Sequence, residues 1–141
     1  MFPDLNANFF QKFSILKTDL NAWTKGNLQH PHVDMNLDEY NMATVKIAFM
    51  PLTQHGMFLS VWKPREKQST LVFVKCGTIF CIDKSVIHAG GFAPGGTEGM
   101  RLQFVFSNDA LDTMHHQVKM GNDYYHNEDQ IFNIDQVRNN F

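Results

Sequence analysis

Residues 77–107 read GTIFCIDKSVIHAGGFAPGGTEGMRLQFVFS, and this stretch decides the fold that the sequence predicts. It begins with an apolar run typical of a strand, Thr78–Ile82, followed by a turn and by a second strand that leads into His88. A glycine-rich segment then predicts a loop. Met100–Phe106 alternates between two faces and predicts a third strand, with Arg101 close to its start. The stretch therefore predicts a histidine and an arginine on neighbouring strands.

The region before this stretch is also rich in strand signals. Ala43–Met50, Gly56–Trp62 and Thr70–Lys75 are β-type runs separated by short segments with turn or charged residues. Six β-segments with short connections favour an antiparallel sandwich or barrel. We therefore expect a mainly β core over residues 27–107.

The N-terminal region, residues 1–26, is predicted to be helical. Asp4 can cap such a helix, and Gly26 can end it. Apolar side chains recur at spacings of three and four residues, which is typical of an amphipathic helix that packs on a sheet. These apolar residues are Leu5, Phe9, Phe13, Leu16 and Leu20.

The C-terminal region, residues 108–141, is predicted to be a helical tail. A first helix is expected to start at Ser107 or Asn108 and to run through Met120, because Gly121 follows as a stop signal. One or two further helical turns are expected over Asp129–Val137. Both flanking regions would then cover one face of the β core.

Composition limits the classes of function. The chain has 141 residues and 43% hydrophobic residues, which predicts one globular domain, residues 1–141. Its formal net charge of −2 gives no sign of a nucleic-acid or anionic-membrane partner. The sequence shows neither a signal peptide nor an apolar run long enough to span a membrane. Cys76 and Cys81 are interpreted as reduced thiols, so we expect a cytoplasmic location.

The seven histidines fall into two groups, and the first contains the candidate site residues His30, His32 and His88. His32 and Asp34 form an H-x-D, and alternation along an extended segment places both side chains on one side, where they can reach one ion. His88 opens a later strand. Four others are interpreted as ordinary surface residues: His55, His115, His116 and His126.

This order of motifs resembles the Fe(II)- and 2-oxoglutarate-dependent oxygenases, which are built on the double-stranded β-helix, a jelly-roll fold related to the cupins. In that family an H-x-D precedes the third core strand, a second histidine opens the seventh and a basic residue opens the eighth. Here His32-Val33-Asp34, His88 and Arg101 follow the same order. The resemblance covers about residues 29–107, and residues 87–107 are its most specific part.

The resemblance implies a function and a set of ligands. His32, Asp34 and His88 would bind Fe(II), and Arg101 would hold the distal carboxylate of the cosubstrate 2-oxoglutarate. The implied reaction hydroxylates a substrate while 2-oxoglutarate is converted to succinate and carbon dioxide. Three residues are candidates for a second contact with the cosubstrate: Thr44, Lys46 and Gln103.

The chain also differs from the family pattern. Gln103 stands where many members have a serine or threonine, two residues after the arginine. Only about thirty residues precede the H-x-D, and they are predicted to be mostly helical. The first core strand is therefore expected to be missing, rearranged or supplied by a partner, and an open sheet edge would favour a homodimer.

Two other functions fit the same β core. One is a metal-binding cupin of different activity, because Gly77, Asp83, Ser85 and His88 have the spacing of the second cupin motif. The other is a metal-free binding or interaction module, in which His32 and Asp34 would be solvated. The first alternative leaves Arg101 without a role.

Overall fold

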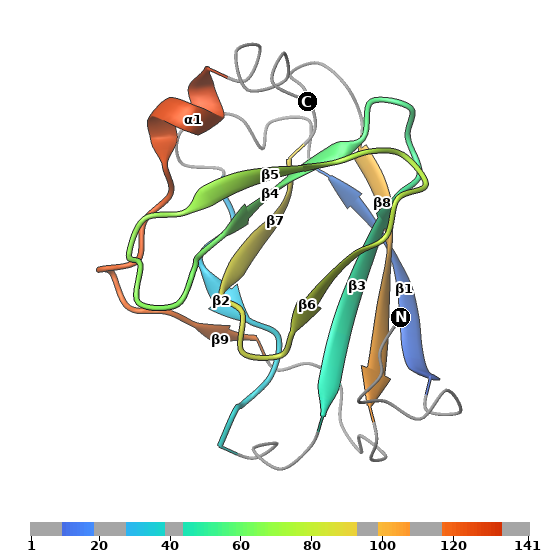
Figure 1. The fold of residues 1–141 in the computed structure, drawn as a ribbon, viewed down its shortest axis with the longest axis horizontal. Coiled ribbons are helices and arrows are strands. Elements are labelled where there is room, and N and C mark those ends of the chain that lie inside the picture. The colour runs from blue at the N-terminus through green and yellow to red at the C-terminus, as the bar shows by residue number, and fades with distance from the viewer. Residues whose placement is uncertain (1–9, 19–27, 39–43, 93–98, 108–116, 134–141) are drawn as a thin grey trace.

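The structure is a computed structural model that describes residues 10–18, 28–38, 44–92, 99–107 and 117–133. This part of the chain is mainly β, as predicted, and its strands form two antiparallel sheets (Figure 1). The first sheet contains β1 (Phe10–Thr18), β8 (Gly99–Ser107), β3 (Val45–Pro51) and β6 (Phe80–Asp83), in that order. The second contains β5 (Thr70–Val74), β4 (Met57–Val61), β7 (His88–Phe92), β2 (His32–Val33) and β9 (Val118–Lys119).

Strand pairing follows a nested order. Strand β1 pairs with β8, β2 with β7, β3 with β6, and β4 with β5, all antiparallel. The pairs β3–β8 and β4–β7 then join these ladders into the two sheets. As a result, β2 and β7 lie side by side although they are far apart in the sequence (Figure 1).

The main core lies between the two sheets. Strand alternation directs every second side chain to this core, so each of the two sheets contributes one face. The cluster draws on β3 and β6 from the first sheet and on β4 and β5 from the second. Its buried members are Ile47, Phe49, Met57, Leu59, Val74 and Ile82.

A second cluster covers the other face of β4 and β5. Ile131 of the short helix α1 (Glu128–Phe132) packs with Phe58 and Leu71, and all three are fully or almost fully buried. The helix begins after Asn127, whose side chain accepts a hydrogen bond from the backbone N–H of Gln130. Figure 1 shows α1 beside β5. Nowhere in the described ranges is there a helix with the length and hydropathy needed to cross a bilayer.

The predicted N-terminal helix is wrong where the structure describes it. Phe10–Thr18 forms β1, which pairs with β8 from Phe10↔Phe106 to Thr18↔Gly99. The segment FQKFSILKT fits a helical spacing, but it also contains aromatic and β-branched residues that suit a strand. Pairing with the long β8 decides between the two, because tertiary contacts override local preference. Strand β1 thus pairs with one edge of β8.

The predicted C-terminal tail is correct in one part and wrong in another. Val118–Lys119 is the short strand β9, paired with β2, and not the end of a helix. Residues 108–116 of that predicted helix lie outside the described residues. The helical turns predicted over Asp129–Val137 are confirmed as α1 as far as Phe132. The expectation of helices on both flanks is therefore replaced by a strand at each flank and one short helix.

Two glycines with positive φ give a direct test of the fold. Gly56 has φ of +67°, and a Cβ there would lie 2.6 Å from the backbone oxygen of Val74. Gly77 has φ of +72°, but a Cβ there would meet nothing within 4 Å. Gly77→Ala should lower the free energy of unfolding by about 1 kcal/mol, since only the left-handed backbone is penalised. Gly56→Ala should cost a further ~1–3 kcal/mol, because strand β5 must also shift.

Urea denaturation of the two variants and the wild type measures both costs. Equal destabilisation by Gly56→Ala and Gly77→Ala would contradict the close approach of Gly56 to β5.

Candidate metal centre

The site is built where β2 meets β7. His32 and His88 stand directly opposite each other in this antiparallel pair. Asp34 follows β2 immediately, and alternation returns its side chain to the side of His32. The backbone alone therefore brings the H-x-D of β2 and the histidine of β7 together.

The three side chains are buried and close. His32, Asp34 and His88 are only 2%, 3% and 3% exposed. The two imidazole centroids lie 4.6 Å apart. Asp34 Oδ1 lies 3.3 Å from His32 Nε2 and 3.6 Å from His88 Nε2. One ligand atom from each residue lies within 4.8 Å of the others, so this group could hold a metal ion.

Backbone carbonyls orient both imidazoles. His32 Nδ1 lies 2.8 Å from the carbonyl oxygen of His30, and His88 Nδ1 lies 3.0 Å from that of Val86. A carbonyl oxygen can only accept, so Nδ1 carries the proton and donates in each case. Both Nε2 atoms therefore point to Asp34. Metal-binding histidines are commonly fixed in this way, with one nitrogen donating to a carbonyl and the other on the metal.

The charges in the group are compatible with a bound cation. Burial lowers the pKa of His88, and His32 and Arg101 lower it further, against the opposite effect of Asp34. The neutral imidazole presents a lone pair at Nε2, which faces the lone pairs of a carboxylate oxygen. Two acceptors form no hydrogen bond with each other, whereas a metal ion can bind the lone pairs of both. A single divalent ion would satisfy both imidazoles and the carboxylate at once.

Strand β8 adds two polar side chains beside this group. Gln103 Nε2 donates a hydrogen bond of 3.0 Å to Asp34 Oδ2. Arg101 lies two residues earlier on the same face of the strand. Its Nε atom is buried and has no hydrogen-bond partner within the described part of the chain. Burial lowers the pKa of Arg101 to about 10, although the charge of Asp34 raises it. The guanidinium thus stays charged at neutral pH and lacks a full set of acceptors.

Apolar side chains lie close to the site. The ring of Phe49 lies 5.6 Å from that of His88. Because Gly90 has no Cβ, the side chains of Leu59 and Arg101 can approach its backbone. A Cβ there would lie 2.8 Å from Leu59 Cδ2 and 3.7 Å from Arg101 Nη2. The three side chains are buried, and burial strengthens the electrostatic interaction of ligands with a bound cation.

The other predicted site residues lie as follows. Lys46 donates a hydrogen bond of 3.2 Å from Nζ to Asp83 Oδ2 on β6, and these two residues are paired across the strands. Thr44 directly precedes β3, and its contact with a cosubstrate stays a prediction. Gln103 lies in the site, although its observed partner is a carboxylate of the group itself.

His126 was missed by the sequence interpretation. It was predicted to be an ordinary surface residue, but its ring is half-buried and makes two hydrogen bonds. Nε2 lies 2.8 Å from the carbonyl oxygen of Gln29, and Nδ1 lies 3.1 Å from Ser60 Oγ. Burial lowers the pKa of His126, against the opposing effect of the Gln29 carbonyl. The Gln29 side chain accepts a further hydrogen bond from the backbone N–H of Gly90. His126 and Gly90 thus both contact Gln29, in the segment that leads into β2.

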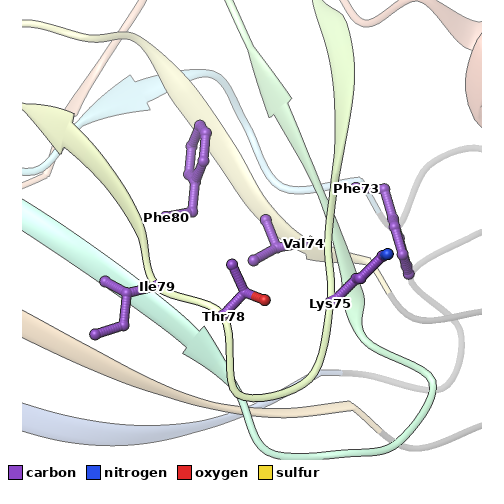
Figure 2. Close-up of a pocket in the computed structure, with 6 residues that line it drawn as sticks. All are labelled: Phe73, Val74, Lys75, Thr78, Ile79 and Phe80. Atoms are coloured by element: carbon purple, nitrogen blue, oxygen red, sulfur yellow. The ribbon is translucent and has the colours of Figure 1, made fainter. Parts of the chain in front are cut away.

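A separate hollow lies at the turn between β5 and β6 (Figure 2). It has a volume of about 340 Å³ and a mostly apolar lining. None of the three residues of the candidate metal group contributes to it. Its lining residues are Phe73, Val74, Lys75, Thr78, Ile79 and Phe80.

Comparison with known proteins does not identify a function for this chain. No protein-family model matches the chain, and no curated protein matches it closely enough to count as a relative. The geometry of His32, Asp34 and His88 is therefore the main guide to function.

Removal of single ligands tests the site. His88→Ala and Asp34→Ala should each weaken Co(II) binding by more than about 100-fold, because loss of a mere hydrogen-bond partner of a ligand already costs ~10–100-fold. His55→Ala is the matched control, since His55 lies in the loop between β3 and β4, away from the group. Isothermal titration measures the three affinities. Binding that survives both ligand variants would place the metal elsewhere.

Proposed function

We propose that the chain is an Fe(II)- and 2-oxoglutarate-dependent dioxygenase that hydroxylates a substrate and releases succinate and carbon dioxide. The observation that carries this proposal is the group of two imidazole Nε2 atoms and one carboxylate oxygen, with a buried and incompletely paired guanidinium on the adjacent strand. The resemblance of the motif order to that family adds support.

The strand order supports a double-stranded β-helix. In that fold one long antiparallel ribbon is wound up. The first of its eight strands pairs with the eighth, the second with the seventh, the third with the sixth and the fourth with the fifth. The observed pairs β1–β8, β2–β7, β3–β6 and β4–β5 follow this rule. Strand β1 takes the place of the first core strand.

The donor set supports Fe(II). Two imidazoles and one carboxylate are the facial triad of non-haem iron oxygenases, and they leave positions open for other ligands. When bound, the iron would supply the activation of dioxygen that no side chain can perform. The task of the protein residues is to hold the ion: His32 and His88 through Nε2, and Asp34 through Oδ1.

The charge of the site supports an acidic cosubstrate. Arg101 already balances Asp34, and imidazoles that bind a metal ion add no charge. A divalent ion would thus leave a buried surplus of two positive charges, which is costly without a partner. A dicarboxylic oxo-acid such as 2-oxoglutarate neutralises this surplus, because one carboxylate can bind the metal and the other the guanidinium.

Arg101 also separates this proposal from its two alternatives. A metal-binding cupin of other activity needs the ion but not a buried guanidinium, and an interaction module needs neither. Because a buried charged side chain is retained at a cost, its presence beside the group favours a ligand that bears a carboxylate.

Anaerobic spectroscopy tests the proposal. Protein with Fe(II) and 2-oxoglutarate should show the visible charge-transfer band of a chelated oxo-acid. Arg101→Met should retain Fe(II) affinity but weaken 2-oxoglutarate by about 30-fold or more, since truncating one partner of a buried charge pair costs roughly 2–5 kcal/mol. Arg65→Met, at an exposed arginine, is the matched control.

Each contrary result has a distinct meaning. Metal binding without the band would favour a cupin of other activity, and binding of neither would favour an interaction module. Loss of Fe(II) in Arg101→Met to the same extent as 2-oxoglutarate would contradict the role of the guanidinium.

A further inference from the structure

The two oxygens of Asp34 have different surroundings. Oδ1 faces both imidazoles, at 3.3 Å from His32 Nε2 and 3.6 Å from His88 Nε2. Oδ2 accepts a hydrogen bond of 3.0 Å from the side-chain amide of Gln103. A carboxylate can only accept, so the amide must present its NH₂ group to Asp34, and its orientation is thereby fixed.

We propose that Gln103 is a positioning residue that makes Asp34 a monodentate metal ligand, bound through Oδ1 alone. This inference rests on the metal centre proposed above. The hydrogen bond engages Oδ2 and fixes the plane of the carboxylate, so Oδ2 is held away from the ion. Gln103 itself does not touch the metal.

The binding mode of Asp34 determines how many positions stay open. An octahedral ion held by two imidazoles and one carboxylate oxygen has three free positions. A bidentate carboxylate would leave two, which is too few for a chelating oxo-acid together with dioxygen. A monodentate Asp34 is therefore a condition of the proposed reaction, and Gln103 enforces it.

A neutral donor suits this task. An arginine or lysine at position 103 would compensate the charge of Asp34 and reduce its attraction for a cation. The amide of Gln103 donates without adding a second positive charge beside Arg101, so it does not oppose the binding of a cation. The strand also keeps the side chain in place, because Gln103 is paired with Phe49, whose ring packs on His88.

The first test uses Co(II), whose absorption spectrum reports the number and arrangement of its ligands. Gln103→Met keeps the length of the side chain but has no donor. It should bind Co(II) about 10–100-fold more weakly, as expected when a hydrogen-bond partner of a ligand is lost. The Co(II) spectrum should also change shape, because the released Oδ2 can join the metal. Gln68→Met, at an exposed glutamine in the loop between β4 and β5, is the matched control and should match the wild type.

A second variant separates positioning from simple damage to the fold. Gln103→Asn keeps an amide but is one methylene too short to reach Oδ2, so it should show the same change in the Co(II) spectrum as Gln103→Met. A wild-type spectrum and affinity in both variants would overturn the inference while leaving the metal centre intact. A loss of affinity with an unchanged spectrum would also overturn it. Failure of the wild type to bind Co(II) would overturn the metal centre and the inference together.

Discussion

The antiparallel pairing of β2 with β7 is the constraint on which the site depends. It places His32 opposite His88, although the two belong to distant parts of the chain. Strand β2 is only two residues long, so its position is secured by its neighbours: β9 pairs with its other edge, and the backbone N–H of Met120 donates to the carbonyl of Pro31. Because β2 is paired on both edges, this short segment can hold His32, and Asp34 directly after it, in a buried position.

Burial of the polar side chains of the site is unfavourable in free energy, and hydrogen bonds offset part of this cost. Burial of a carboxylate and two imidazoles among apolar residues is unfavourable unless each polar atom has a partner. Carbonyl oxygens satisfy both Nδ1 atoms, and Gln103 satisfies Asp34 Oδ2. The two Nε2 atoms and Asp34 Oδ1 face one another at 3.3 and 3.6 Å. Hydrogen bonds thus engage the outer atoms of the group, while Asp34 Oδ1 and the two Nε2 atoms lie close enough together to hold one metal ion.

Much of the site could be predicted from the sequence because strand periodicity is local. The spacing of His32 and Asp34 predicted that both side chains lie on one side, and they do. Other features depend on distant contacts. The segment Phe10–Thr18 fits a helix or a strand equally well, and its partner β8 decides the outcome. His126 is fixed by residues from two remote segments. The partner of Gln103 is likewise set by packing, since 69 residues separate it from Asp34.

The central claim is that one metal ion lies between His32, His88 and Asp34. Anomalous diffraction from crystals grown with Co(II), recorded on both sides of the cobalt absorption edge, tests it most directly. The account predicts one peak within bonding distance of both Nε2 atoms and of Asp34 Oδ1, with Oδ2 still hydrogen-bonded to Gln103. A peak elsewhere on the chain, or side chains of these three residues turned away from one another, would contradict it.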